Sequence, residues 1–390
     1  MTGRRLLSTD GCVVVHDGVP PFVVLDATGN EVEPISAYLK DRMLGGVSPL
    51  TCRSYGYDLL RWYRLLWVLE VPWNCASEAD TAALVGWLRR ADNPQRRRTR
   101  LSSLTAGSVN SRTGKPEPQA GYAPATIGHT LTVVCGFYDF HLHFGRGPLV
   151  NPVPETKSRR MALAHRSPLE AKRPHRRARL RPKVPARQPR SMPDSLFDEL
   201  FARMGNDRDR ALLSFYVSSG ARASELLGVG MEDVSWADQR IWVVSKGTRL
   251  RQAVPASPES FVHLGRYLDV AGPPPAGTPV WRTLRGGPRP FTYWALRQVV
   301  ERANNQLGTN WTLHDLRHTA AARMASDPNM TLPEIQVIMR HAHVTTTQLY
   351  TVPRLEDLAD KLADHYGRPR EEPRWSGFYD PEDVRTVFGG

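Results

Sequence analysis

Long apolar runs are missing from this sequence. No stretch approaches the roughly 18 consecutive apolar residues that a membrane-spanning helix needs. The first residues, MTGRRLLSTDGCVVVHDG, also lack the continuous apolar segment of a signal peptide. We therefore expect no membrane span and a cytoplasmic protein.

Cysteine is also scarce, with four residues in a chain of 390. Cys12, Cys52, Cys75 and Cys135 are widely spaced and include no Cys-x-x-Cys pair. This spacing argues against a thiolate zinc site and against a disulfide framework. We interpret all four as reduced thiols that are mostly structural.

Acidic residues are outnumbered, and the imbalance is local. The chain has 52 Lys and Arg against 39 Asp and Glu, a net charge of +13. Residues 157–190 hold thirteen of these cations, one acid and five prolines, so the rest of the chain is nearly neutral. Like charges and prolines favour an extended linker. Two interpretations of it stay open: a solvated spacer, or a strap that neutralises DNA phosphates across a groove. The DNA-binding candidates are Arg176, Arg177, Arg179 and Arg181 in this segment, and Arg249 beyond it.

The segment before this linker, residues 29–150, has the pattern of a helical domain. Ser48 followed by a proline is a good helix start, because serine caps the N-terminus and proline fits the first turn. Apolar residues recur at helical spacing over 55–66, 84–88 and 127–142. Since the aromatic residues follow the same spacing, we assign them to the core rather than to base stacking.

Beyond the linker the pattern is mixed. Residues 240–246 and 251–256 predict two strands joined by a turn that contains glycine. Helical spacing occurs at 196–204, 210–217, 292–303, 313–325 and 333–339. We expect a mainly α, multi-domain chain in which a helical domain is followed by an α+β domain with a small β-hairpin. The expected parts are an N-terminal arm (1–28), a helical domain (29–150), a basic proline-rich linker (151–193), the α+β domain (194–365) and a C-terminal tail (366–390).

Four short motifs of the α+β domain carry groups suited to chemistry on a phosphodiester. They are SGARASELLGV, VSKGTRLRQAVP, LHDLRH and MRHAHVTTTQLYTV. In the LHDLRH motif, His314 and Arg317 lie one helical turn apart, so both can face one target. In chain order the motifs supply Arg222 and Glu225, Lys246, His314 and Arg317, and His341 and Tyr350.

Together these residues resemble the active site of the tyrosine recombinases, or phage-type integrases. The family pattern is Arg, Lys, His-x-x-Arg, His or Trp, and Tyr, and all six positions are filled here. The resemblance covers roughly residues 195–360 and extends more loosely to 29–150, which is similar to the family's core-binding (SAM-like) DNA-binding domain. The sequence departs from the pattern at Met339-Arg340-His341, where Leu-Gly-His is usual, and at Gly220-Ala221-Arg222, where Gly-Leu-Arg is usual.

The resemblance implies that Tyr350 attacks a DNA phosphate and that Lys246 protonates the departing 5′-oxygen. The residue types suit this chemistry, because planar and permanently charged guanidinium groups bind the charge that gathers on non-bridging oxygens. Arg222 and Arg317 have that role, while His314 and His341 bond the same oxygens or manage the tyrosine proton. We expect Glu225 to orient Arg222. A phosphotyrosyl ester keeps the phosphate bond energy, so we expect no cofactor, neither ATP nor metal.

Some of these residues also have a purely structural interpretation. Arg222 and Glu225 have the spacing of an intrahelical salt bridge, and Lys246 taken alone is an ordinary hairpin lysine. The histidines at 314, 318, 341 and 343 raise the question of zinc, but no carboxylate or cysteine completes a site among them. We therefore expect no metal.

From these observations we expect a site-specific recombinase that forms a 3′-phosphotyrosyl link to double-stranded DNA. The expected assembly is a homo-tetramer on specific recombination sites, with a monomer or weak oligomer when free, associated with the nucleoid. Two alternatives stay open: a type IB topoisomerase, and a non-catalytic DNA-binding protein on the same scaffold. The sequence does not name the DNA site or show whether the element served is a phage, a transposon or a chromosome-dimer system.

Overall fold

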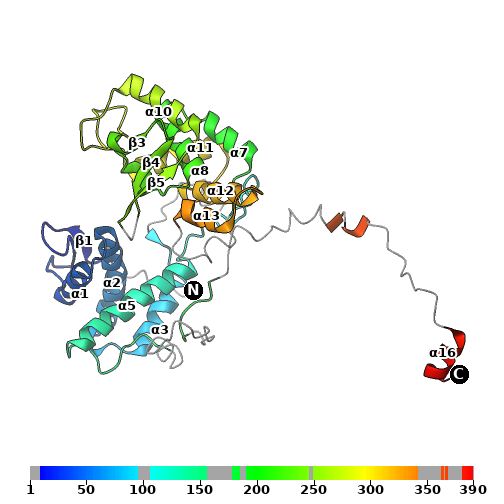
Figure 1. Ribbon diagram of the computed structural model, residues 1–390. Coiled ribbons are helices and arrows are strands. Elements are labelled where there is room, and N and C mark those ends of the chain that lie inside the picture. Colours follow the sequence, from blue (N-terminus) through cyan, green and yellow to red (C-terminus); the bar gives the residue numbers. More distant parts are fainter. Residues whose placement is uncertain are drawn as a thin grey trace. The chain divides into compact units, whose positions relative to one another are not determined.

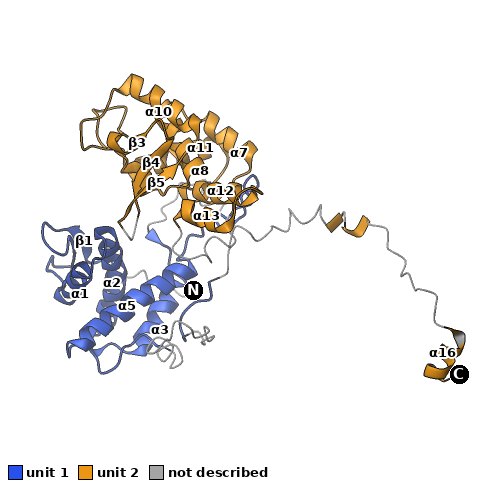
Figure 2. Ribbon diagram, viewed as in Figure 1, with its two compact units in different colours: residues 1–187 blue, residues 188–390 orange. Residues whose placement is uncertain are grey.

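The computed structural model divides the chain into two compact units, Met1–Arg187 and Gln188–Gly390 (Figure 2). It describes residues 9–94, 106–155, 178–184, 190–245, 249–340, 362–363, 365–367 and 380–389. Helices predominate in both units, and each unit also holds a small antiparallel sheet (Figure 1). The mainly α fold with a small hairpin in the second part is therefore confirmed.

The first unit is built on helices that follow the predicted apolar stripes. Ser48 is the N-cap of α2, and its hydroxyl accepts the backbone N–H of Thr51 at 3.3 Å. The predicted aromatic core is confirmed: Trp62 and Tyr138 are fully buried, and the indole N–H donates to the tyrosine hydroxyl at 3.0 Å. The elements are β1 (Cys12–Val15), β2 (Phe22–Leu25), α1 (Glu33–Leu44), α2 (Pro49–Leu69), a 3-10 turn (Trp73–Cys75), α3 (Glu78–Leu88) and α5 (Pro124–His143).

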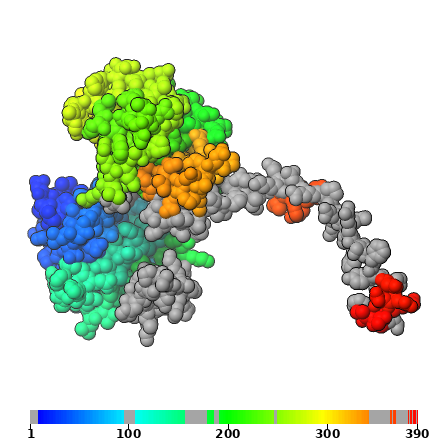
Figure 3. All heavy atoms as spheres, in the orientation of Figure 1, coloured from blue at the N-terminus to red at the C-terminus, as the bar shows by residue number. Residues whose placement is uncertain are grey.

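The hairpin β1–β2 was not predicted; it lies in the expected N-terminal arm (1–28), before the helical domain (29–150). Its strands pair antiparallel with Cys12 opposite Leu25. The hairpin covers α2, where Val24 is fully buried and Gly56 leaves room for Val13 and Val24. The space-filling view shows this blue segment as part of the body of its unit (Figure 3). β-Branched valines suit such a half-buried strand, but four residues give too short a pattern to distinguish from a loop.

In the second unit α8 is the central helix: α10 and α12 pack against it, and it also contacts β5 of a three-stranded sheet. The sheet has the order β3-β4-β5, and β4 pairs with β5 from Arg240–Pro255 to Val244–Arg251. The elements are α7 (Asp194–Ala202), α8 (Asp207–Ser219), α9 (Ala223–Leu227), a 3-10 turn (Met231–Asp233), β3 (Val234–Ser235), β4 (Arg240–Val244), β5 (Arg251–Pro255), α10 (Pro258–Ala271), α11 (Tyr293–Leu307), α12 (Leu313–Ser326), α13 (Leu332–Met339) and α16 (Pro381–Phe388).

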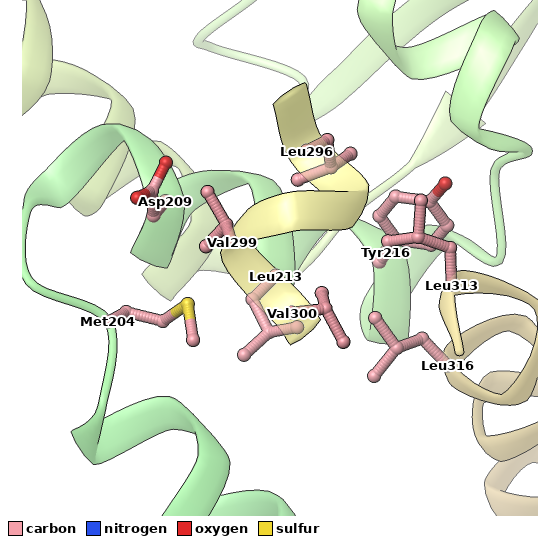
Figure 4. Close-up of a pocket in the computed structure, with 9 residues that line it drawn as sticks. All are labelled: Met204, Asp209, Leu213, Tyr216, Leu296, Val299, Val300, Leu313 and Leu316. Carbon is pink, nitrogen blue, oxygen red and sulfur yellow. The ribbon is translucent and has the colours of Figure 1, made fainter. Parts of the chain in front are cut away.

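The core of this unit is apolar and closely packed where α8, α11 and α12 meet. Leu213, Val300 and Leu316, one from each helix, point toward one another (Figure 4). The cavity between them has a volume of only about 10 Å³, which is too small for a substrate. The helices that bear the site motifs, α8, α9 and α12, therefore rest on a rigid base.

Helix α10 was also missed, although Ser257 and Pro258 repeat the start signal that was recognised at Ser48. Its buried face includes Phe261, Leu264 and Tyr267, and it packs along α8.

Within the described ranges, no helix is both long and apolar enough to cross a membrane.

Candidate active site

Arg222 is held at the sharp junction between α8 and α9. Gly220 ends α8 in the left-handed region with φ of 59°, and Arg222 is the extended N-cap residue of α9. A side chain at Gly220 would overlap the sulfur of Met339, which is fully buried. Two reasons thus favour glycine here: it adopts the left-handed backbone conformation without strain, and it has no side chain that would overlap Met339.

Glu225 fixes Arg222 from inside the first turn of α9. One carboxylate oxygen, Oε2, accepts the backbone N–H of Arg222 at 2.9 Å, and the other, Oε1, accepts its Nη1 at 2.7 Å. The Glu225 side chain is 1% exposed, whereas that of Arg222 is 31% exposed. The predicted spacing thus produces a real ion pair, and the arginine keeps part of its surface toward solvent.

The charge of Glu225 is strongly stabilised. Burial raises the pKa of this carboxyl, but the backbone N–H of Arg222, the charge of Arg340 and the side chain of Arg222 outweigh burial and lower the pKa to about 2. Glu225 is therefore an anion at any neutral pH, and it holds two arginines together rather than one.

Arg340 is the second of these arginines, and its place in the site was not predicted. Its Nη2 donates to Glu225 Oε2 at 3.0 Å, and its Nη1 donates to the carbonyl of Ile338 at 2.7 Å. Arg340 also ends α13 with φ of 52°, a left-handed conformation that costs a non-glycine residue about 1–2 kcal/mol. The turn that glycine usually makes in the family is thus kept here with an arginine in its place.

Arg317 lies in the interior beside the same residues. It is 4% exposed, and its Nη1 and Nη2 donate to the carbonyl oxygens of Gly220 and Met339. These carbonyls end α8 and α13, where helices have unpaired acceptors and partial negative charge. Through these hydrogen bonds Arg317 connects α12 to the C-terminal ends of α8 and α13.

His314 stands on the exposed side of the first turn of α12. Thr312 and Asp315 form a capping box at this end, with Thr312 N–H donating to the carboxylate at 2.7 Å. The His314 ring lies 4.2 Å from that of His318, one turn further on. The described residues contain no cluster of three metal-ligating side chains.

We call Arg222, Arg317 and Arg340, together with Glu225, the arginine cluster. Of the six predicted catalytic residues, the structure brings Arg222 and Arg317 together in this cluster and puts His314 on the same helix as Arg317. The other three, Lys246, His341 and Tyr350, lie outside the described residues.

The basic linker and the hairpin loop are partly described. Arg179 forms an ion pair with Glu78 of α3, and Arg181 donates to Thr132 of α5 at 2.9 Å, so both side chains contact the first unit. Arg249 is exposed, at the end of the hairpin loop, with φ of 56°. We call Arg176, Arg177, Arg179 and Arg181 the linker arginines; the first two lie outside the described residues.

Comparisons with known proteins find similar sequences along most of the chain. Residues 194–356 match the phage integrase family. Transposase A from transposon Tn554 of Staphylococcus aureus is 24% identical over 352 residues, which cover 87% of this chain and 91% of the relative. Tyrosine recombinase XerC of Pelobacter propionicus is 31% identical over 170 residues, 42% of this chain and 55% of the relative, so the match spans about half of that relative's length.

A solved structure shows the same fold. A lambda integrase dimer bound to a COC′ core site has a TM-score of 0.56 and 14% identity, covering 83% of this chain and 95% of the integrase chain. Because the matches cover 87% and 83% of this chain, the similarity extends into both units. Residues 194–356 thus match the phage integrase family, and the chain as a whole is similar to a transposase and shares the fold of lambda integrase.

Proposed function

We propose that this protein is a site-specific DNA recombinase that cleaves and rejoins DNA through a covalent 3′-phosphotyrosyl intermediate. The observation that carries the proposal is the arginine cluster, in which an ionised Glu225 holds Arg222 at a helix start. A preorganised cation at such a place suits a phosphate that gains charge during in-line attack. The match of residues 194–356 to the phage integrase family and the similarity to a transposase support the same activity.

The proposed reaction begins when the hydroxyl oxygen of Tyr350 attacks phosphorus. The P–O bond to the 5′-oxygen breaks, Lys246 gives that oxygen a proton, and the phosphate stays on the tyrosine. Attack by the 5′-hydroxyl of a partner strand then reverses these steps and joins the new strands. Because the ester keeps the bond energy, the cycle needs no ATP.

We propose distinct roles for the remaining groups. Arg222 and Arg317 stabilise the charge on the non-bridging oxygens, and Glu225 orients Arg222. His314, on the exposed side of α12, and His341 hydrogen-bond the same phosphate or manage the tyrosine proton. The linker arginines and Arg249 bind DNA phosphates.

We propose that the protein binds double-stranded DNA with specific sites and assembles on it as a homo-tetramer. The lambda integrase structure, a dimer on a core site, supports assembly on DNA. A relative that matches along most of the chain is a transposase, which favours a transposon as the element served. We also propose a cytoplasmic, nucleoid-associated location.

The decisive experiment uses a cognate duplex nicked just beyond the scissile phosphate. Cleavage then releases a short fragment, religation fails, and the protein–DNA adduct accumulates. The Tyr350→Phe variant keeps the ring but lacks the nucleophilic oxygen, so it should bind the site normally and give no adduct under denaturing electrophoresis. An adduct that persists in this variant would overturn the assignment of Tyr350.

Two further variants separate the other roles. Arg222→Ala should bind but cleave about 10²–10³ times more slowly, the usual cost of one preorganised charge contact. Lys246→Ala should recover activity on a substrate with a 5′-bridging sulfur, because a departing thiolate needs no proton. Relaxation of supercoiled DNA by a monomer, without exchange between sites, would instead indicate a topoisomerase.

A further inference from the structure

Arg340 stands where the family pattern has glycine, and its side chain turns inward to the carboxylate that orients Arg222. We propose that Arg340 is a positioning residue for DNA cleavage: it holds and neutralises Glu225, and through Glu225 it sets the orientation and net charge of Arg222. This inference rests on the proposed function, because the effect is exerted on the reacting phosphate.

The first argument is geometric. Glu225 Oε2 accepts from the backbone N–H of Arg222 at 2.9 Å and from Nη2 of Arg340 at 3.0 Å, while Oε1 accepts from Nη1 of Arg222 at 2.7 Å. With partners on both oxygens, the carboxylate plane is fixed, and so is the guanidinium that it orients. Without Arg340, one of the two bonds that hold Oε2 is lost.

The second argument concerns charge. Arg222 and Glu225 alone form a neutral pair, whose attraction for a phosphate anion is weak. With Arg340 these three residues carry a net charge of +1, and because Glu225 and Arg340 are almost fully buried, their charges are poorly screened. The Arg340 side chain is only 6% exposed, against 31% for Arg222. Arg340 thus acts through Glu225 rather than by contact with DNA.

The third argument is the backbone. Glycine adopts the left-handed conformation at position 340 without strain, so the turn by itself does not call for arginine. Arginine offsets the strain with bonds to Glu225, to the carbonyl of Ile338 at 2.7 Å and to that of Gly220 at 3.5 Å. The carbonyl of Arg340 also accepts Nη2 of Arg222 at 3.4 Å. That last bond needs no side chain, so substitution by glycine tests the side chain alone.

The test is single-turnover adduct formation on the nicked duplex by the full-length chain, with the DNA dissociation constant and the melting temperature measured beside it. We expect Arg340→Gly to bind DNA within about three-fold of the wild type and to cleave about 10 to 100 times more slowly, since small misplacements of a catalytic group cost up to about 10²-fold. Arg340→Lys keeps the positive charge but lacks the planar guanidinium group, so it should cleave faster than Arg340→Gly and more slowly than the wild type.

A double variant separates positioning from a general loss of stability. In Glu225→Gln no carboxylate charge remains to be neutralised, so adding Arg340→Gly should slow cleavage much less than it does in the wild type. Gln239→Gly is the matched control, because it removes another left-handed, non-glycine residue (φ of 50°) from an exposed turn of the same unit. This control should cleave at the wild-type rate.

The outcomes distinguish a failure of the role proposed for Arg340 from a failure of the proposed function. If the wild type forms the adduct and Arg340→Gly cleaves within two-fold of it, Arg340 only ends a helix and the proposal is overturned. Equal slowing by Arg340→Gly with and without Glu225→Gln overturns it as well. If the wild type forms no adduct on a site that it binds, the proposed function fails, and the role of Arg340 fails with it.

Discussion

Replacing Glu225 by glutamine tests the arginine cluster at its centre. Glutamine has nearly the same shape, and its amide oxygen can still accept the backbone N–H of Arg222. What is lost is the negative charge between Arg222 and Arg340. Arg340, with 6% of its side chain exposed, is then left with a buried charge and no anion beside it.

The structure sets the size of the effect. A fall of the Glu225 pKa from 4.5 to about 2 in the folded protein corresponds to about 3 kcal/mol of stability at neutral pH. Breaking a buried ion pair by removing one partner typically costs about 3–5 kcal/mol, which agrees. For a unit of this size we expect Glu225→Gln to lower the melting temperature by roughly 6–12 °C.

Thermal and urea unfolding at several pH values provide the assay. Because the folded pKa lies below the ordinary value, the contribution of Glu225 is complete above about pH 4.5 and disappears as the pH falls toward 2. The difference between wild type and variant should therefore be constant from pH 7 to 5 and shrink below that. Glu301→Gln is the control, since its ion pair with Arg297 is exposed and such pairs contribute less than about 1 kcal/mol. Equal stability of Glu225→Gln and Glu301→Gln at pH 7 would refute the reasoning.

Three further predictions concern other parts of the chain. Gly220→Ala should destabilise the second unit by about 1–3 kcal/mol in urea unfolding, because the new methyl group meets both an unfavourable backbone conformation and the Met339 sulfur; a smaller loss would mean that Met339 moves aside freely. Replacing all four linker arginines by alanine should weaken DNA binding and flatten its salt dependence by up to about 0.9 per lost phosphate contact, and an unchanged slope would rule out a DNA strap. We also predict that the C-terminal tail (366–390) docks on a neighbouring protomer, so truncation after Tyr366, which removes α16, should spare cleavage of a single site and abolish synapsis; recombination of two sites by the shortened protein would contradict this docking.

The helices could be predicted where caps and apolar periodicity agreed. Ser48 with Pro49 marked the start of α2, and the stripe through Trp62 gave its buried face. The same rules failed for β1–β2, because four-residue strands are stabilised by packing on α2 rather than by their own pattern. Helix α10 does carry the signal that these rules require, because Ser257 followed by Pro258 has the same form as the start of α2.

The candidate site was predictable only where side chains are close in sequence. Arg222 and Glu225 are three residues apart, so their pairing followed from helix geometry. Arg340 lies more than a hundred residues beyond Glu225, and at its position the chain departs from the family pattern. No local rule indicates that an arginine at a helix end turns inward, because its partners belong to α8 and α9 and are set by tertiary packing.

The interior place of Arg317 ties stability to the proposed chemistry. Its guanidinium bonds the last carbonyls of α8 and α13, and leaving such buried acceptors unpaired costs about 1–3 kcal/mol each. Arg317→Ala therefore removes the hydrogen bonds to both helix ends as well as a charge. Arg222, with 31% of its side chain exposed, can be replaced with less effect on packing. A slow Arg317→Ala enzyme is evidence for transition-state stabilisation only if its unfolding free energy is measured too. Arg222→Ala isolates the electrostatic effect more cleanly, because the helix ends remain bonded to Arg317.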